Sequence, residues 1–215
     1  MKPQHHPPEE FLLQYASGAA TEPFALVIAA HLVYCAQCRA AVAQAEAIGG
    51  ALLDALEPAS ADQSSVDRDI AKILDRAARQ PEPLPRAVPA NLASPLGAYV
   101  GDLNHVSWRP LGPGIQHSVL AKDKHGAVAR LLRIAPGRSV FGHSHGGNEL
   151  TLVLEGSYRA GGAQFRSGDV ECADETVSHR PVADPGATCI CLAVTDRPLR
   201  FHNLLGRLMQ NFIRI

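Results

Sequence analysis

The stretch GRSVFGHSHGGNELTLVLEG, residues 137–156, decides the fold that we expect for the second half of the chain. His143 and His145 stand two residues apart, so in a strand both side chains point to the same side and enter one barrel interior. Glu149 follows in the adjoining turn region and completes that face. A glycine at each end of the stretch permits a tight turn. The spacing therefore predicts a metal site between neighbouring strands.

A further histidine, His179, follows Gly168 at a spacing that completes this pattern. The two stretches resemble the two motifs of the cupin family, whose fold is an all-β barrel of the jelly-roll type. The resemblance implies a metal site of three histidines and one carboxylate, made by His143, His145, Glu149 and His179. Asp174, Thr176 and Ala183 depart from the second motif. These departures lie in the turn between strands and leave the ligand positions unchanged.

The ligand types alone do not select the metal of this site. Nitrogen and oxygen ligands suit zinc, iron, manganese, nickel or copper. The alternative is a cupin barrel whose histidines form hydrogen bonds and bind no metal. Other histidines have no matching spacing, and we expect surface or supporting positions for His105, His117, His125 and His202.

The rest of the second half has the pattern of an all-β domain. Short apolar runs are separated by Gly and Pro turns, which is typical of a sandwich or a barrel. Cys189 and Cys191 alternate along one such run and share a face, so they either fill the barrel or form a redox-responsive pair. Residues 203–213 carry apolar side chains at helical spacing and predict a closing helix.

A proline-rich stretch divides the chain. Five prolines fall between residues 81 and 95, and proline at that density sustains neither a helix nor a central strand. The fold class that we expect is therefore α+β multidomain. We predict an all-α helical domain over residues 1–80, a linker over 81–96 and the β domain over 97–215.

The first 80 residues are helical in character. We predict a short helix over residues 9–16, a long alanine-rich helix over 24–48 with Thr21 as its N-cap, and an amphipathic helix over 62–79. The last of these brings four apolar side chains to one face, those of Ile70, Ile73, Leu74 and Ala77. Three helices make a marginal core, and small domains of that size often add a structural metal.

One cluster in the long helix suits such a metal. His31, Cys35 and Cys38 are separated by four and three residues, which in a helix returns them to one face. An imidazole and two thiolates suit a tetrahedral zinc, and His5-His6 offers a fourth ligand. The alternatives are a buried helix histidine with two small apolar cysteines, a thioredoxin-like redox pair, and a solvated N-terminus.

Composition and charge exclude several classes of function. The formal net charge of -1 gives no general attraction for nucleic acid or for an anionic membrane surface. Residues 1–10 lack the pattern of a secretion signal, and no apolar stretch reaches the roughly 18 residues of a spanning helix. A C-x-x-C pair without an export signal indicates metal or redox chemistry rather than disulfides. We expect a cytoplasmic protein.

The helical part resembles the zinc-binding domain of anti-sigma factors, and the whole chain resembles the ChrR-type anti-sigma factors. The first resemblance rests on H-x-x-x-C-x-x-C and on the opening His5-His6, Leu12-Leu13, Tyr15-Ala16 and Gly18. It implies zinc ligation by His6, His31, Cys35 and Cys38, and a module that wraps an extracytoplasmic-function sigma factor. Four apolar residues are then either partner contacts or domain core, namely Phe11, Leu12, Phe24 and Val27.

The resemblance implies a negative regulator of transcription and not an enzyme. The helical domain would hold the sigma factor, and the cupin domain would release it on oxidative stress of the singlet-oxygen type. The cupin domain would bind zinc or another divalent transition metal, and a small-molecule ligand is possible there. The alternative is a cupin-type metal-dependent dioxygenase acting on a small organic molecule, which needs an open metal position. Bound iron with oxygen uptake would favour the dioxygenase.

Overall fold

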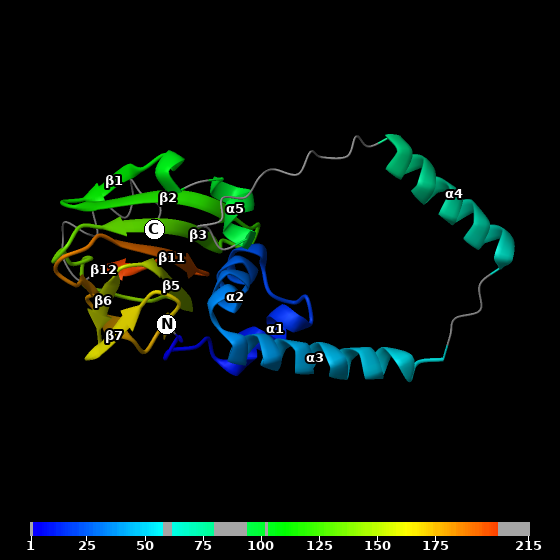
Figure 1. The fold of residues 1–215 in the computed structure, drawn as a ribbon, viewed down its shortest axis with the longest axis horizontal. Coiled ribbons are helices and arrows are strands. Elements are labelled where there is room, and N and C mark those ends of the chain that lie inside the picture. The colour runs from blue at the N-terminus through cyan, green and yellow to red at the C-terminus, as the bar shows by residue number, and fades with distance from the viewer. Residues whose placement is uncertain (1, 58–61, 80–93, 102, 202–215) are drawn as a thin grey trace. The chain divides into compact units, whose positions relative to one another are not determined.

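Figure 1 shows the fold in a computed structural model of the chain. The chain divides into two compact units, one of residues 1–46 with 88–215 and one of residues 47–87. The helix expected over residues 203–213, His202, and most of the expected linker lie outside the described residues, so the domain boundaries stay a prediction. The structure describes residues 2–57, 62–79, 94–101 and 103–201.

Within the described ranges, four helices precede the proline-rich stretch. They are α1 (Glu9–Ala16), α2 (Glu22–Tyr34), α3 (Ala36–Asp54) and α4 (Gln63–Arg79). α1 has the expected bounds, and α4 begins one residue later than expected. Thr21 is the N-cap of α2 by position, but its side chain makes no capping hydrogen bond.

The prediction of one continuous helix over residues 24–48 is wrong, because the chain breaks at Cys35. That residue has φ -114° and ψ 104°, an extended conformation that ends α2. The backbone N–H of Cys38 donates to the Sγ of Cys35 at 3.4 Å, so the thiol caps the start of α3. The break places Cys35 just before α3 and Cys38 in the first turn of that helix.

α2 lies at the centre of the first unit. It contacts α1, α5 (Ser94–Val100) and four strands of the large sheet, namely β2 (Ile115–Lys122), β3 (Val128–Ile134), β5 (Glu149–Glu155) and β11 (Cys189–Thr195). The four apolar residues left open between partner contacts and core, Phe11, Leu12, Phe24 and Val27, are all buried in this cluster. They form domain core because α2 is apolar around most of its circumference and needs cover on several sides.

The strands after α5 pair only in antiparallel fashion within the described residues. The large sheet has the order β1-β2-β3-β11-β5-β8, and two three-stranded sheets have the orders β10-β6-β7 and β12-β4-β9. The strands are β1 (Arg109–Gly112), β2 (Ile115–Lys122), β3 (Val128–Ile134), β4 (His143–Ser144), β5 (Glu149–Glu155), β6 (Ser157–Ala160), β7 (Ala163–Arg166), β8 (Val170–Ala173), β9 (Ser178–His179), β10 (Val182–Ala183), β11 (Cys189–Thr195) and β12 (Arg200–Phe201).

The large sheet is buried on both faces at its centre. Side chains alternate along a strand, so Ile190 and Leu192 of β11 pack in the cluster that contains α2, while Cys189 and Cys191 pack in a second cluster. That second cluster fills part of the interior between the sheets. The alternation therefore gives one face to the helices and the other face to the interior where the histidines of the first motif lie.

The later part of α3 and the whole of α4 expose their large apolar side chains. No described residue of α4 is buried, and the face predicted for it is open to solvent. No helix among the described residues has the length and apolar character to cross a membrane. The exposed fractions are 58% for Ile48, 67% for Leu52, 69% for Leu53, 50% for Ile70, 67% for Ile73 and 64% for Leu74.

Candidate metal centres

The first candidate centre brings together a histidine and cysteine cluster at the break between α2 and α3. One ligand atom from each of His6, His31, Cys35 and Cys38 lies within 4.8 Å of the others. His6 Nδ1 lies 3.3 Å from Cys35 Sγ and 3.5 Å from Cys38 Sγ. His31 Nε2 lies 3.3 Å from Cys38 Sγ. The four residues come from the segment before α1, the last turn of α2, the break, and the first turn of α3.

These distances fit a zinc ion. Zinc–nitrogen bonds of about 2.0 Å and zinc–sulfur bonds of about 2.3 Å give a tetrahedral nitrogen–sulfur edge of about 3.5 Å. The three measured edges span 3.3 to 3.5 Å. Two nitrogen and two sulfur donors are also a ligand set of structural zinc sites. The cluster can therefore hold zinc without large rearrangement.

Burial explains why this cluster favours a cation. The His31 side chain is completely buried, and this desolvation lowers its pKa to about 4, so the ring is neutral near pH 7. Burial also raises the pKa of the Cys38 thiol, with a further contribution from Cys35. A thiolate is thus costly here unless a positive charge lies beside it, and a bound metal supplies that charge.

The turn between β7 and β8 forms hydrogen bonds that position the ligands of this cluster. His31 Nδ1 hydrogen-bonds to the backbone oxygen of Gly168 at 2.8 Å. That bond leaves Nε2 to face the cysteines, which is the usual arrangement around a metal-bound histidine. Asp169 Oδ1 accepts hydrogen bonds from the backbone N–H groups of Gln4 and His5, and the N–H of Val170 donates to the oxygen of His5.

Sequence reasoning missed these supporting residues. Gln4 and Asp169 are 165 positions apart, and His31 and Gly168 are 137 positions apart. No periodicity within one helix or strand relates such positions. The two N-terminal histidines also differ in their contacts. The ring of His5 packs on Phe165 with centroids 4.5 Å apart, whereas His6 joins the cluster.

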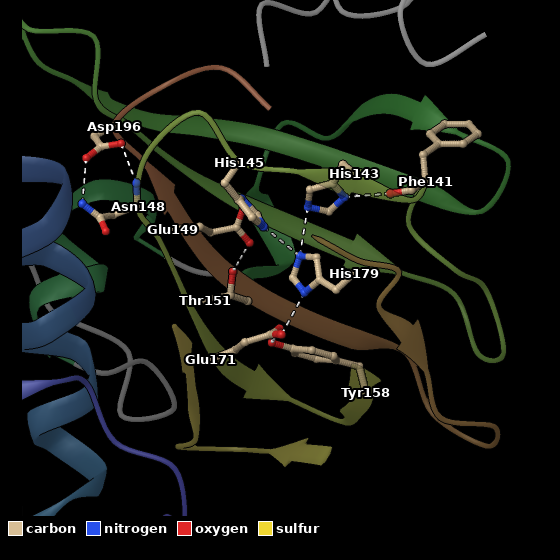
Figure 2. Close-up of polar contacts among 10 residues, drawn as sticks. All are labelled: Phe141, His143, His145, Asn148, Glu149, Thr151, Tyr158, Glu171, His179 and Asp196. Atoms are coloured by element: carbon tan, nitrogen blue, oxygen red, sulfur yellow. Dashed lines mark hydrogen bonds and ion pairs between the residues drawn. The ribbon is translucent and has the colours of Figure 1, made fainter. Parts of the chain in front are cut away.

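The second candidate centre is a histidine triad between β4 and β9. Figure 2 shows the rings of His143, His145 and His179 turned toward one another. His179 Nε2 lies 3.0 Å from His143 Nε2 and 3.2 Å from His145 Nε2. His143 and His179 are register partners across the two strands. Residues far apart in sequence therefore meet through strand pairing.

Outer hydrogen bonds fix the orientation of two of these rings. His143 Nδ1 lies 2.7 Å from the backbone oxygen of Phe141, and His179 Nδ1 lies 2.9 Å from Glu171 Oε1. Both oxygens only accept, so each Nδ1 carries the proton and each Nε2 presents a lone pair. Tyr158 in turn donates its hydroxyl to Glu171 Oε2 at 2.6 Å (Figure 2). Neither Glu171 nor Tyr158 belongs to a spaced motif, and both were missed from sequence.

The converging lone pairs make this triad a suitable metal site. Burial lowers the pKa of His145 to about 4, with a further contribution from His143, so the ring is neutral at ordinary pH. Metal–nitrogen bonds of about 2.1 Å give nitrogen–nitrogen edges of about 3.0 to 3.4 Å, depending on coordination geometry. The two measured edges fall in that range. Three ring nitrogens that face one another in this way suit a divalent cation.

The carboxylate of Glu149 lies beside the triad but outside the group of converging atoms. Its Oε2 is 3.5 Å from His145 Nδ1, and its Oε1 accepts a hydrogen bond from Thr151 at 2.9 Å. Burial raises the pKa of this carboxyl. Its assignment as a fourth ligand stays a prediction.

Among the residues that the structure describes, the remaining cysteines and histidines do not join either cluster. Cys189 and Cys191 are buried with their sulfur atoms 3.5 Å apart, where they help to fill the interior. Cys172, His105 and His125 are exposed. His117 is buried on β2.

The chain is similar to proteins of known family along most of its length. Residues 97–198 match the model of a family described as the ChrR cupin-like domain. The anti-sigma-E factor ChrR of Cereibacter sphaeroides is 43% identical over 213 residues, which cover 99% of each chain. A crystal structure of Rhodobacter sphaeroides SigE in complex with the anti-sigma ChrR contains a chain that is 40% identical, with a TM-score of 0.75. That match covers 90% of the present chain and 99% of the other.

Proposed function

Because the chain belongs to the ChrR family of anti-sigma factors, we propose that it binds and sequesters an extracytoplasmic-function sigma factor. The predictions of the family and of a helical part with a Cys/His cluster followed by a β cupin domain are confirmed. The protein is a regulator and not an enzyme. The observation that carries the proposal is the 43% identity to an anti-sigma factor along 99% of both chains.

The exposed apolar side chains of α3 and α4 support a protein partner. α4 buries none of its described side chains, although it has one apolar face. An apolar helix face of this kind gains stability when a partner removes it from water. Since the net charge of -1 gives no general attraction for nucleic acid, a sigma factor is the partner that fits both the surface and the family. A sigma factor acts on RNA polymerase, so we place this function in the cytoplasm.

A binding experiment tests this proposal directly. The purified chain is mixed with the sigma factor encoded beside it and passed through a size-exclusion column. We expect one complex with equal amounts of both proteins and bound zinc. Separate elution of the two proteins, with zinc present in the chain, would contradict the proposal.

A charge placed on the exposed face of α4 should weaken this complex. Leu74 is 64% exposed and belongs to the apolar face with Ile70 and Ile73. We expect Leu74→Asp to lower the affinity for the sigma factor at least tenfold, about 1.4 kcal/mol, because the carboxylate would have to lose water in the interface. Calorimetric titration measures the change. Ala71→Asp, which adds the same charge outside that face, is the control and should change affinity little.

For the metals, we propose zinc at the first centre, held by His6, His31, Cys35 and Cys38. At the second centre we propose zinc or another divalent transition metal, held by His143, His145 and His179 with Glu149 as the fourth ligand. Bound zinc would supply a structural crosslink at the first centre. The chain itself positions the rings through the oxygens of Gly168, Phe141 and Glu171.

We further propose that the cupin senses oxidative stress of the singlet-oxygen type and transmits it along residues 168–171. The backbone oxygen of Gly168 bonds to His31 of the first centre, and the carboxylate of Glu171 bonds to His179 of the second. Four consecutive residues therefore support both centres. A shift of β8 caused at the triad would move the hydrogen bonds that hold the N-terminal segment.

Substitution of Gly168 should uncouple the two centres. Gly168 has φ +92°, and a Cβ atom there would lie 3.1 Å from Tyr34 Cβ and from Pro3 Cγ. We expect Gly168→Ala to displace the turn and to reduce the release of sigma factor under a photosensitiser and light to less than half. Gel filtration of the complex before and after illumination measures release.

Gly162→Ala is the matched control for this prediction. Gly162 has φ +84° but nothing within 4 Å of an added Cβ atom. Both variants therefore carry a similar backbone strain, of about 1 to 3 kcal/mol, and only Gly168→Ala crowds the helical part. Equal release from the two variants would contradict the proposed route.

A further inference from the structure

A buried tyrosine connects the surroundings of the two candidate metal centres. Tyr158 of β6 is 1% exposed, and it contacts Glu171 through its hydroxyl and Phe165 through its ring. Glu171 bonds to the histidine triad, and Phe165 contacts the N-terminal segment that carries His6. One side chain therefore touches the supports of both centres.

The hydroxyl of Tyr158 acts on the triad through a carboxylate. It donates to Glu171 Oε2 at 2.6 Å, and Glu171 Oε1 accepts from His179 Nδ1 at 2.9 Å (Figure 2). Burial raises the pKa of the hydroxyl well above its usual value, so the group keeps its proton and stays a donor. Each carboxylate oxygen has its own partner. The carboxylate is thereby fixed, and with it the orientation of the His179 ring.

The ring of Tyr158 acts on the N-terminal segment through a second aromatic side chain. Tyr158 and Phe165 are register partners on β6 and β7, and their rings stack with centroids 5.2 Å apart. Phe165 also contacts the ring of His5, with centroids 4.5 Å apart. His6 is the next residue, and its Nδ1 lies 3.3 Å from Cys35 Sγ of the first centre. Three rings therefore link β6 to a ligand-bearing segment.

Tyr99 makes the same kind of hydrogen bond at another place and serves as a comparison. Its hydroxyl donates to Glu22 Oε1 at 2.8 Å, but its side chain is 40% exposed, and neither residue belongs to a metal cluster. Water competes for an exposed bond of this kind. The bond of Tyr158 is shielded from water, so it restrains its carboxylate more strongly.

We propose that Tyr158 is a positioning residue shared by the two centres. Its hydroxyl sets the ring of His179 through Glu171, and its own ring sets the N-terminal segment through Phe165. A movement of His179 on loss of metal displaces the carboxylate and then turns the tyrosine ring against its neighbour. The packed interior passes this displacement on because it contains few voids. The metal content of the second centre therefore changes how firmly the N-terminal segment is held at the first.

This inference rests on the proposed metals of the two centres and adds a side-chain route to the backbone route along residues 168–171. Coupling between two sites is a free energy, so it is measured as a change at one site caused by occupancy of the other. The side-chain route can be cut alone. Tyr158→Phe removes one hydroxyl and leaves the stacked ring and the backbone of residues 168–171 in place.

Hydrogen–deuterium exchange of residues 2–8 measures this coupling. The backbone N–H groups of Gln4 and His5 donate to Asp169, so their exchange reports how firmly the segment is held. The full-length chain is measured with zinc in both centres and again after a mild chelator has emptied the second. Metal analysis checks that zinc stays on the thiolates of the first. We expect exchange in the unmodified chain to become at least about fivefold faster when the second centre is emptied.

Two variants cut the route at different points. Tyr158→Phe should reduce the change in exchange to about twofold or less and should lower the metal affinity of the second centre about tenfold, as loss of an outer hydrogen bond does. His5→Ala removes the ring that contacts Phe165. It should reduce the change in exchange to the same degree and leave the metal affinity of the second centre as it was. Tyr99→Phe is the matched control and should behave as the unmodified chain does.

Three outcomes would count against the inference. If Tyr158→Phe kept the full change in exchange shown by Tyr99→Phe, the backbone route alone would carry the coupling and the inference would be overturned. A triad that binds no metal would contradict the proposed second centre, and metal analysis shows this separately. Should Tyr158→Phe fail to fold, His5→Ala decides, because His5 is only partly buried. An undiminished change in that variant would also overturn the inference.

Discussion

A Cys38→Ser variant is expected to lose the N-terminal metal and the ability to hold a sigma factor. Cys38 is almost completely buried, and its sulfur faces His31 and His6. A serine hydroxyl is a poor replacement for a thiolate ligand. Structural zinc contributes about 10 to 16 kcal/mol in small zinc domains, which is comparable with the whole stability of a domain, about 5 to 15 kcal/mol. The helical part should therefore unfold locally.

Metal analysis and the column assay with the sigma factor measure this result. We expect the zinc of the first centre to disappear and the affinity for the sigma factor to fall at least a hundredfold, about 2.7 kcal/mol. Cys172→Ser is the matched control, because Cys172 is exposed and lies in neither cluster. A Cys38→Ser protein that binds the sigma factor normally would show that zinc at this site is not needed for inhibition.

A His145→Ala variant is expected to lose the metal of the second centre and to keep the ability to hold a sigma factor. His145 is 1% exposed, and its Nε2 atom lies 3.2 Å from that of His179. Removal of one ring leaves two converging donors, so we expect metal at the second centre to fall below a tenth of its normal content. The cluster of His6, His31, Cys35 and Cys38 contains no atom of this residue, and binding of the sigma factor should stay within twofold of normal.

Release of the sigma factor is the quantity that should change in His145→Ala. Under a photosensitiser and light we expect most of the complex to persist, whereas the unmodified complex dissociates. His125→Ala removes an exposed histidine and serves as the control. If His145→Ala lost sigma-factor binding as fully as Cys38→Ser, the proposed separation of holding and sensing would be wrong.

Short-range pattern accounts for the parts of the fold that were predicted correctly. Residues 9–16 and 62–79 carry their own helix signals, and the observed helices match them within one residue. The long helix failed because alanine-rich sequence favours helix on both sides of Cys35 and contains no breaker there. The backbone at Cys35 is extended, and the sulfur of this residue caps α3 and faces His6. This tertiary arrangement overrides the local preference for helix.

By spacing alone the sequence determined that His31, Cys35 and Cys38 gather at one candidate centre and that His143 and His145 gather at the other. His6 and His179 were assigned through the resemblance to known families, and the placement of Glu149 stays a prediction. Spacings of two, three and four residues are read directly through the geometry of a strand or a helix turn. Only the tertiary structure decided what surrounds them: the backbone oxygen of Gly168 behind His31, and the carboxylate of Glu171 behind His179. Such contacts join distant parts of the chain, and they depend on how sheets and helices pack rather than on any repeat along the sequence.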